Sequence, residues 1–212
     1  MENLKYKTIV VLGILGAGKD TQAELLEKKL GYTIISSGEV LRQKCKADKE
    51  FCNKVQHYQD SGDLVPNEIV FDVLKENLDK HVDENLLLTG VVRRFPQVEM
   101  LDKILKDSGR KLDLVVFLEL SDEDAIDRLS KRVYDPKTGK TYHMEFNPPA
   151  EGIEVKRRAD DEPESIKLRL VRYHEAINGI LDEYEKRSIL LRVSAKGNIN
   201  EISDSLVDFL KK

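Results

Sequence analysis

The chain has 212 residues, of which 40% are hydrophobic and 35% charged, a composition typical of a folded domain with one substantial core. Its formal net charge of −4 argues against a dedicated nucleic-acid binder, because such proteins are normally basic. The sequence has no apolar run long enough to span a membrane and no apolar segment typical of a secretion signal at its start. We therefore expect a cytoplasmic protein with neither a membrane nor a nucleic acid as partner.

The first predicted strand, residues 8–12, runs directly into a glycine-rich turn. Residues 13–19 match the spacing G-x-x-x-x-G-K, and residues 20–30 have the pattern of an amphipathic helix. In such a strand–turn–helix arrangement, glycines let backbone N–H groups surround a phosphate, while the helix N-terminus and the lysine add positive charge. Residues 13–19, here called the phosphate loop, therefore predict the binding of a nucleoside phosphate.

Four further short apolar runs alternate with helical patterns along the chain. This alternation predicts an α/β fold with a five-stranded parallel sheet covered by helices on both faces. The additional strands are expected at residues 32–35, 85–88, 114–118 and 188–193. Helices are expected to begin near Pro66, Pro96 and Ser121, and a long one to occupy residues 162–186.

Two stretches interrupt the alternation. Residues 36–65 contain two polar helical patterns without a strand between them, which indicates a small helical insert. Its two cysteines, Cys45 and Cys52, are expected to be free thiols, because their spacing in a helical region suits a disulfide poorly. Residues 133–156 are rich in proline and glycine, a pattern that indicates a flap with a hairpin. Beside a phosphate loop, we interpret this flap as a lid that closes over substrate.

In their order and spacing, these segments resemble the adenylate kinases, a family of nucleoside-monophosphate kinases, over nearly the whole chain. The stretches that carry the resemblance are residues 13–19, 36–42, 61–65, 90–97, 127–132, 146–149 and 158–161. The resemblance implies a P-loop NTPase fold with a helical AMP-binding insert and a lid insert. The implied boundaries are 1–35, 66–131 and 159–212 for the core, 36–65 for the AMP-binding insert and 132–158 for the lid.

The resemblance also implies an activity, ATP + AMP ⇌ 2 ADP, in a monomer that uses Mg²⁺ with ATP. No structural zinc is expected, because the flap lacks a cysteine cluster. The implied catalytic residues are Lys19, Arg93, Arg132, Arg158 and Arg169, with Asp160 and Asp161 orienting the lid arginines. The implied ATP-binding residues are Gly16, Ala17, Gly18, Lys19, Asp20, Thr21, Arg128 and Arg132. The implied AMP-binding residues are Ser37, Arg42, Leu64, Val65, Gly90, Arg93, Gln97, Arg158 and Arg169.

The arginines suit this chemistry because a guanidinium stays ionised and binds two phosphate oxygens at once. Arg128 is expected to lie flat against the donor adenine. Gln97 is expected to offer both a donor and an acceptor to the adenine edge of AMP.

Several positions depart from the family pattern. Thr89 stands where the family has an acidic residue that holds the water shell of magnesium, and Asp63 replaces a lysine. Val91 and Val92 replace a Phe-Pro pair. Asp20 adds a carboxylate after Lys19, and two roles for it remain open: a position near Mg²⁺, or a cap for the first helix. Two rival functions also remain open, namely a UMP/CMP or GMP kinase of the same fold and a weakly active sensor of adenine nucleotides.

Overall fold

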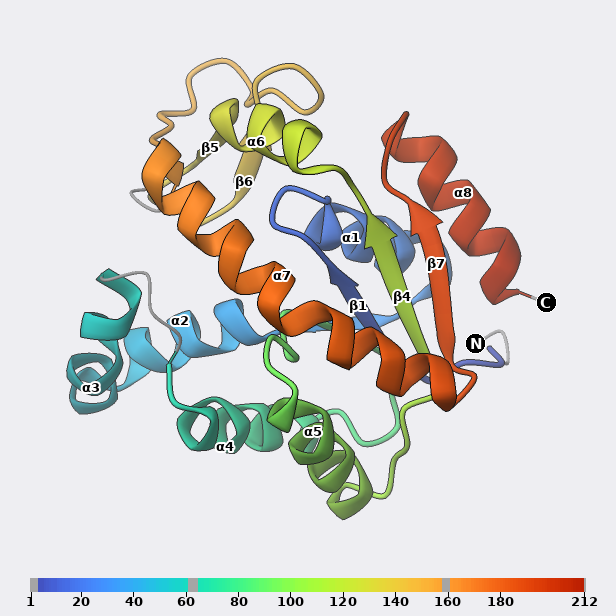
Figure 1. Cartoon of the computed structure of the whole chain (residues 1–212). Helices are drawn as coiled ribbons and strands as arrows, with labels where there is room; N and C mark the ends of the chain where they lie inside the picture. The colour runs from blue at the N-terminus through green and yellow to red at the C-terminus, as the bar shows by residue number, and fades with distance from the viewer. Residues whose placement is uncertain (1–3, 61–64, 158–160, 212) are drawn as a thin grey trace.

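The computed structural model describes residues 4–60, 65–157 and 161–211. Its centre is a five-stranded parallel sheet in the order β2-β3-β1-β4-β7 (Figure 1). The five strands are β1 (Thr8–Gly13), β2 (Thr33–Ser36), β3 (Leu86–Thr89), β4 (Leu114–Glu119) and β7 (Leu190–Ser194). The predicted parallel sheet is confirmed, and each strand begins and ends within two residues of its expected position.

Helices cover both faces of this sheet, which explains why its central strands read as continuous apolar runs. Successive side chains of a strand point to opposite faces. Accordingly, Val10 and Leu88 lie in one cluster with α4 (Asn67–Leu78), α5 (Pro96–Asp107) and the later part of α7 (Pro163–Lys186). Ile9, Val11 and Leu87 point to the other face and lie in a second cluster with α1 (Lys19–Leu30) and α8 (Ile199–Leu210). The sheet is therefore held between two apolar layers.

The ends of the helices follow local signals in the sequence. Pro96 is the first residue of α5, Pro66 directly precedes α4, and the Ser121 hydroxyl caps α6 by accepting the backbone N–H of Asp124 at 3.1 Å. The long helix α7 begins at Pro163, one residue after its expected start. The helices are α1 (Lys19–Leu30), α2 (Ser37–Ala47), α3 (Lys49–Asp60), α4 (Asn67–Leu78), α5 (Pro96–Asp107), α6 (Asp122–Ser130), α7 (Pro163–Lys186) and α8 (Ile199–Leu210).

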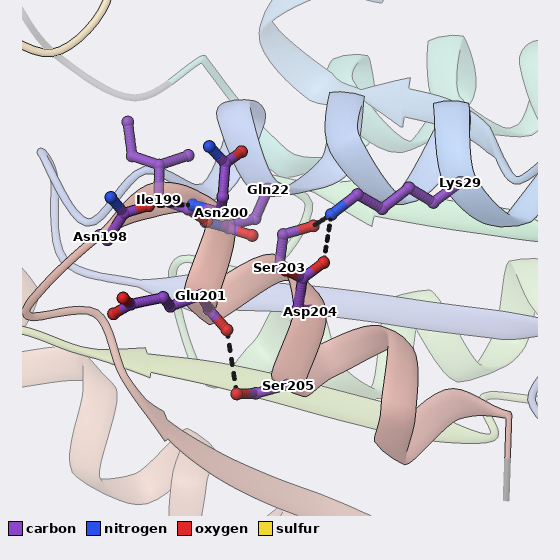
Figure 2. Close-up of polar contacts among 9 residues, drawn as sticks. All are labelled: Gln22, Lys29, Asn198, Ile199, Asn200, Glu201, Ser203, Asp204 and Ser205. Atoms are coloured by element: carbon purple, nitrogen blue, oxygen red, sulfur yellow. Dashed lines mark hydrogen bonds and ion pairs between the residues drawn. The ribbon is translucent and has the colours of Figure 1, made fainter.

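Helix α8 has no counterpart among the expected elements, and the structure shows that it packs against α1 and is hydrogen-bonded to it. Lys29 at the end of α1 donates to Ser203 Oγ at 3.0 Å and to Asp204 Oδ1 at 2.8 Å (Figure 2). Near the start of α1, the buried Gln22 donates to the carbonyl of Ile199 at 3.0 Å (Figure 2). The helix that follows the phosphate loop is thus fixed at both ends by α8.

Two structures extend from the sheet. Helices α2 and α3 follow each other between β2 and α4, and they carry Cys45 and Cys52, which are free thiols as expected. The flap contains the expected hairpin, formed by the antiparallel strands β5 (Arg132–Tyr134) and β6 (Thr141–His143). Figure 1 shows α7 passing from the hairpin across the face of the sheet. Within the described ranges, no helix is long and apolar enough to cross a membrane.

Candidate active site

The phosphate loop connects β1 to α1 and is packed closely against the rest of the core. A Cβ at Gly13 would lie 2.8 Å from the carbonyl oxygen of Leu118, and one at Gly16 would lie 3.1 Å from that of Ala125. Gly16 also has a φ of 82°, a conformation that residues with a side chain rarely adopt. Glycine is therefore required at these positions because β4 and α6 leave no room beside the loop.

Lys19 is the first residue of α1, and its side chain turns back over the loop. Its ammonium group donates to the carbonyls of Gly13 and Ile14, both at 2.9 Å. Burial lowers the pKa of Lys19 to about 8, and the neighbouring carboxylate of Asp20 opposes this shift. The positive charges of Arg93, Arg132 and Arg169 lower the same pKa further. The charges of basic side chains from four parts of the chain therefore act on one another at the phosphate loop.

Asp161 ties two of these arginines together. Its carboxylate accepts from Arg132 Nε at 2.7 Å and from Arg132 Nη2 at 2.5 Å, a two-point contact, and it lies 3.7 Å from Arg169 Nη1. The Asp161 side chain is only 2% exposed, so this contact is weakly screened by water. Arg132 comes from the hairpin and Arg169 from α7, and Asp161 thus sets the position of one guanidinium relative to the other. Arg158 and Asp160 lie outside the described residues.

A second group of residues gathers where β2 and β3 end. The buried Ser37 hydroxyl donates to the carbonyl of Gly90 at 2.7 Å, and Arg93 Nε donates to the same oxygen at 3.2 Å. Gly90 has a φ of 68°, and a Cβ there would lie 3.0 Å from Ser37 Oγ. Arg93 is thus held at this turn, from which its charge acts on Lys19. Val65 is buried in the apolar cluster nearby, and Leu64 lies outside the described residues.

Gln97 is already engaged in this turn. Its Oε1 accepts the backbone N–H groups of Arg93 at 2.6 Å and Arg94 at 3.0 Å, and its Nε2 donates to Asn67 Oδ1 at 2.8 Å. Both lone pairs of the carbonyl oxygen are therefore used, and one N–H remains for a ligand. The structure differs here from the expectation that Gln97 offers both a donor and an acceptor. Asn67, the first residue of α4, is a partner of Gln97 that sequence analysis did not predict.

Two other predicted arginines have protein partners away from Lys19. Arg42 on α2 contacts Glu39 at 2.6 Å, and both side chains are nearly half exposed. Arg128 on α6 donates to the carbonyl of Ala195 at 2.8 Å and to that of Gly16 at 3.4 Å. Arg128 thus joins the phosphate loop to the end of β7, and its guanidinium borders the loop on that side.

The Asp20 carboxylate faces the end of β3. Asp20 is the second residue of α1, and its Oδ1 accepts a hydrogen bond from the Thr89 hydroxyl at 3.0 Å. Among the described residues, none of its hydrogen bonds goes to the backbone of its own helix. Thr21, the next residue, lies half-buried in the same first turn.

Clusters of side chains that could bind a metal ion are absent from the described part of the chain. No group of three or more His, Cys, Asp or Glu residues gathers there in a way that could bind one. His143 in the hairpin is used structurally: its Nδ1 accepts the N–H groups of Glu145 and Phe146, both at 3.2 Å. Burial lowers the pKa of His143, which is consistent with a neutral ring that accepts these bonds.

Comparison with known proteins shows the family of the chain. A family model described as adenylate kinase matches residues 11–189. This chain is 38% identical to an adenylate kinase of Caldicellulosiruptor bescii over 211 residues, which cover 96% of this chain and 97% of the relative. It is 36% identical to the adenylate kinase of Methanothrix thermoacetophila, over 96% of this chain and 98% of that protein. The chain belongs to the adenylate kinase family.

As a member of the adenylate kinase family, the chain combines the P-loop core with the two projecting structures described above. The resemblance inferred from short motifs is thus shown over most of the chain. The charges of Arg93, Arg132 and Arg169 act on Lys19, whereas Arg42 pairs with Glu39 and Arg128 bonds to the carbonyls of Ala195 and Gly16.

Proposed function

We propose that this chain is an adenylate kinase that catalyses ATP + AMP ⇌ 2 ADP. The observation that carries the proposal is the phosphate-loop lysine, which is held on two loop carbonyls, feels the charges of three arginines and lies beside a loop whose glycines the packing requires. Phosphoryl transfer between two nucleotides brings several negative phosphates together, so its catalysis consists mainly of positioning and charge stabilisation. Four cations around one glycine-rich loop supply that stabilisation.

The proposed roles follow from the element that carries each side chain. The backbone N–H groups of the phosphate loop and Lys19 bind the donor phosphates, while Arg93, at the turn after β3, holds the phosphate of AMP. Arg132 and Arg169, aligned by Asp161, contact the transferring group when the lid closes. By resemblance we assign Arg158 to the same group, Arg128 to the donor adenine and Arg42 to AMP. Residues 36–65 are the proposed AMP-binding insert, and residues 132–158 the proposed lid.

Mg²⁺ is the proposed cofactor, and the site fits an ion that arrives with ATP. When bound with ATP, such an ion would neutralise part of the charge on the phosphates. Magnesium takes oxygen ligands and keeps several waters, so one carboxylate beside the phosphate loop is a sufficient protein contribution. Asp20 supplies a carboxylate at that place.

The first prediction concerns the acceptor. With ATP as donor, AMP is expected to give the highest kcat/KM among AMP, UMP, CMP and GMP in a coupled assay of diphosphate formation. The physical reason is that Ser37 and Gln97 are buried and polar, and a site with fixed hydrogen-bond groups rejects partners that leave those groups unpaired. A higher value for UMP, CMP or GMP would assign the chain to a different monophosphate kinase. Nucleotide binding without turnover of any of the four would support the sensor alternative.

The second prediction tests the carboxylate that aligns the arginines. Asp161→Asn keeps the shape of the side chain but removes the charge that Arg132 and Arg169 share. We expect kcat to fall by about tenfold, because the two guanidinium groups lose their fixed orientation, with the free energy of unfolding reduced by about 1.5 to 3 kcal/mol. The measurements are steady-state kinetics and urea unfolding. Glu162→Gln, an exposed neighbour with the same change of charge, is the control, and equal kinetics in both variants would contradict the role of Asp161.

A further inference from the structure

Two polar side chains meet where the strands β1 and β3 end beside the phosphate loop. The strands are neighbours in the sheet, with Val11 opposite Thr89 in the register. Thr89 is 1% exposed, and its hydroxyl donates to Oδ1 of the exposed Asp20 at 3.0 Å. Among the described residues no hydrogen bond engages the other oxygen, Oδ2. The buried strand thus holds one carboxylate oxygen in place and leaves the other without a hydrogen bond from the described residues.

The two groups are exchanged relative to the general P-loop arrangement. In P-loop NTPases, a hydroxyl side chain directly after the lysine and a carboxylate from a neighbouring strand hold magnesium. Here the carboxylate, Asp20, follows Lys19, and the hydroxyl, Thr89, is at the end of the strand. The chain therefore retains both functional groups at this point of the fold, with their positions reversed.

Charge gives a second reason to associate Asp20 with a cation. A carboxylate beside the loop repels the phosphates of ATP unless a positive ion lies between them. The Asp20 carboxylate raises the pKa of Lys19, but the ammonium group of Lys19 donates to the carbonyls of Gly13 and Ile14 and not to the carboxylate, so a further cation can fill this position. A hydrated magnesium ion would do so, since it accepts carboxylate oxygen directly or through water.

We propose that Asp20, oriented by Thr89, is the carboxylate that binds the water shell of the magnesium ion accompanying ATP. The inference rests on the proposed function for the presence of Mg–ATP at this loop. Asp20 contacts the ion or its waters, and Thr89 is a positioning residue that acts through Asp20. The opposing account is that Asp20 is only an acidic residue in the first turn of α1, where the helix dipole favours negative charge.

The decisive experiment separates ATP binding with the metal from ATP binding without it. In Asp20→Asn, we expect the affinity of Mn²⁺ for the enzyme–ATP complex, measured by electron paramagnetic resonance, to fall about tenfold. ATP binding in the presence of EDTA, measured by calorimetry, is expected to strengthen, because the repelling carboxylate is gone. The helix-dipole account expects both affinities to stay unchanged and only the melting temperature to fall.

Two variants of Thr89 test its positioning role. Thr89→Val removes the hydroxyl at nearly constant volume and is expected to weaken Mn²⁺ binding, whereas Thr89→Ser keeps the hydroxyl and is expected to bind Mn²⁺ like the wild type. The double variant Asp20→Thr with Thr89→Asp returns the groups to the general P-loop arrangement and should restore most of the affinity lost in Asp20→Asn. Glu27→Gln, exposed on the same helix, is the control for the loss of one negative charge.

The outcomes for the metal role and for the proposed function are distinct. Unchanged Mn²⁺ affinity in Asp20→Asn, or an equal loss in Glu27→Gln, would overturn the inference whatever the turnover. If the wild type formed no ADP from ATP and AMP, the proposed function would fail, and the Mn²⁺ measurement on the enzyme–ATP complex would still decide the role of Asp20.

Discussion

Replacement of Arg132 by alanine is expected to lower kcat by about 10²- to 10³-fold, with a much smaller change in the KM for either nucleotide. Arg132 comes from the hairpin of the proposed lid. If the lid closes over the nucleotides as proposed, its charge is expected to stabilise the transition state more than the ground state. The loss of one preorganised donor at a developing charge typically costs about 3 to 4 kcal/mol of transition-state stabilisation. Steady-state kinetics with varied ATP and AMP provide the measurement.

Two further variants make the result interpretable. Arg157→Ala removes an exposed arginine from the same proposed lid and should leave kcat within about twofold of the wild type, as expected for a surface charge. Arg132→Lys keeps the charge but not the planar fork that Asp161 holds at two points, so we expect only partial recovery. A value of kcat near that of the wild type in Arg132→Ala would show that this guanidinium does not act on the transferring group.

Arg93→Ala is expected to affect both binding and turnover. Arg93 lies at the turn that joins β3 to α5, where no lid movement is needed to place it. Its guanidinium can therefore contact the phosphate of AMP before the reaction and during it, and its loss should raise the KM for AMP by about tenfold and lower kcat by about 10²-fold. The KM for ATP should change little.

The neighbouring Arg94 is the matched control, since its side chain is exposed and only its backbone N–H contacts Gln97. Arg94→Ala keeps that backbone contact and should leave both constants close to their wild-type values. If Arg93→Ala changed kcat alone, Arg93 would belong with the arginines that act after closure, and the proposed AMP phosphate site would lie elsewhere.

The fold could be predicted because its signals are local. Strands covered on both faces are apolar throughout, and the phosphate loop carries its glycines at positions that the packing of Leu118 and Ala125 requires. Helix α8 was not predicted, although its apolar residues Ile202, Leu206 and Leu210 recur at helical spacing. The sequence therefore carries a helical pattern there. The hairpin could be predicted from prolines and glycines, because these residues determine the conformation of the chain within a few positions.

The partners within the site were harder to infer, because they depend on contacts between distant segments. The bond from Thr89 to Asp20 joins residues 69 apart, and that from Gln97 to Asn67 joins residues 30 apart. Family resemblance placed Gln97 at the AMP site, but only the conformation of the turn shows that its oxygen is occupied by two backbone N–H groups. The residue types indicate which hydrogen-bond donors and acceptors a site contains. Only the side-chain geometry shows which of them are left for a ligand by the protein's own contacts.

The docking of α8 on α1 also bears on how the protein is made. The hydrogen bonds from Gln22 to Ile199 and from Lys29 to Asp204 span 177 and 175 residues. Helix α1 therefore leaves the ribosome long before α8 is synthesised. Contacts of such long range form slowly, because a long loop of chain must be closed before they contribute. A nascent chain therefore carries α1 without its contacts to α8 for most of its synthesis. Nucleotide that binds the finished loop favours the docked form by mass action, and cellular ATP would in this way help to complete the fold that uses it.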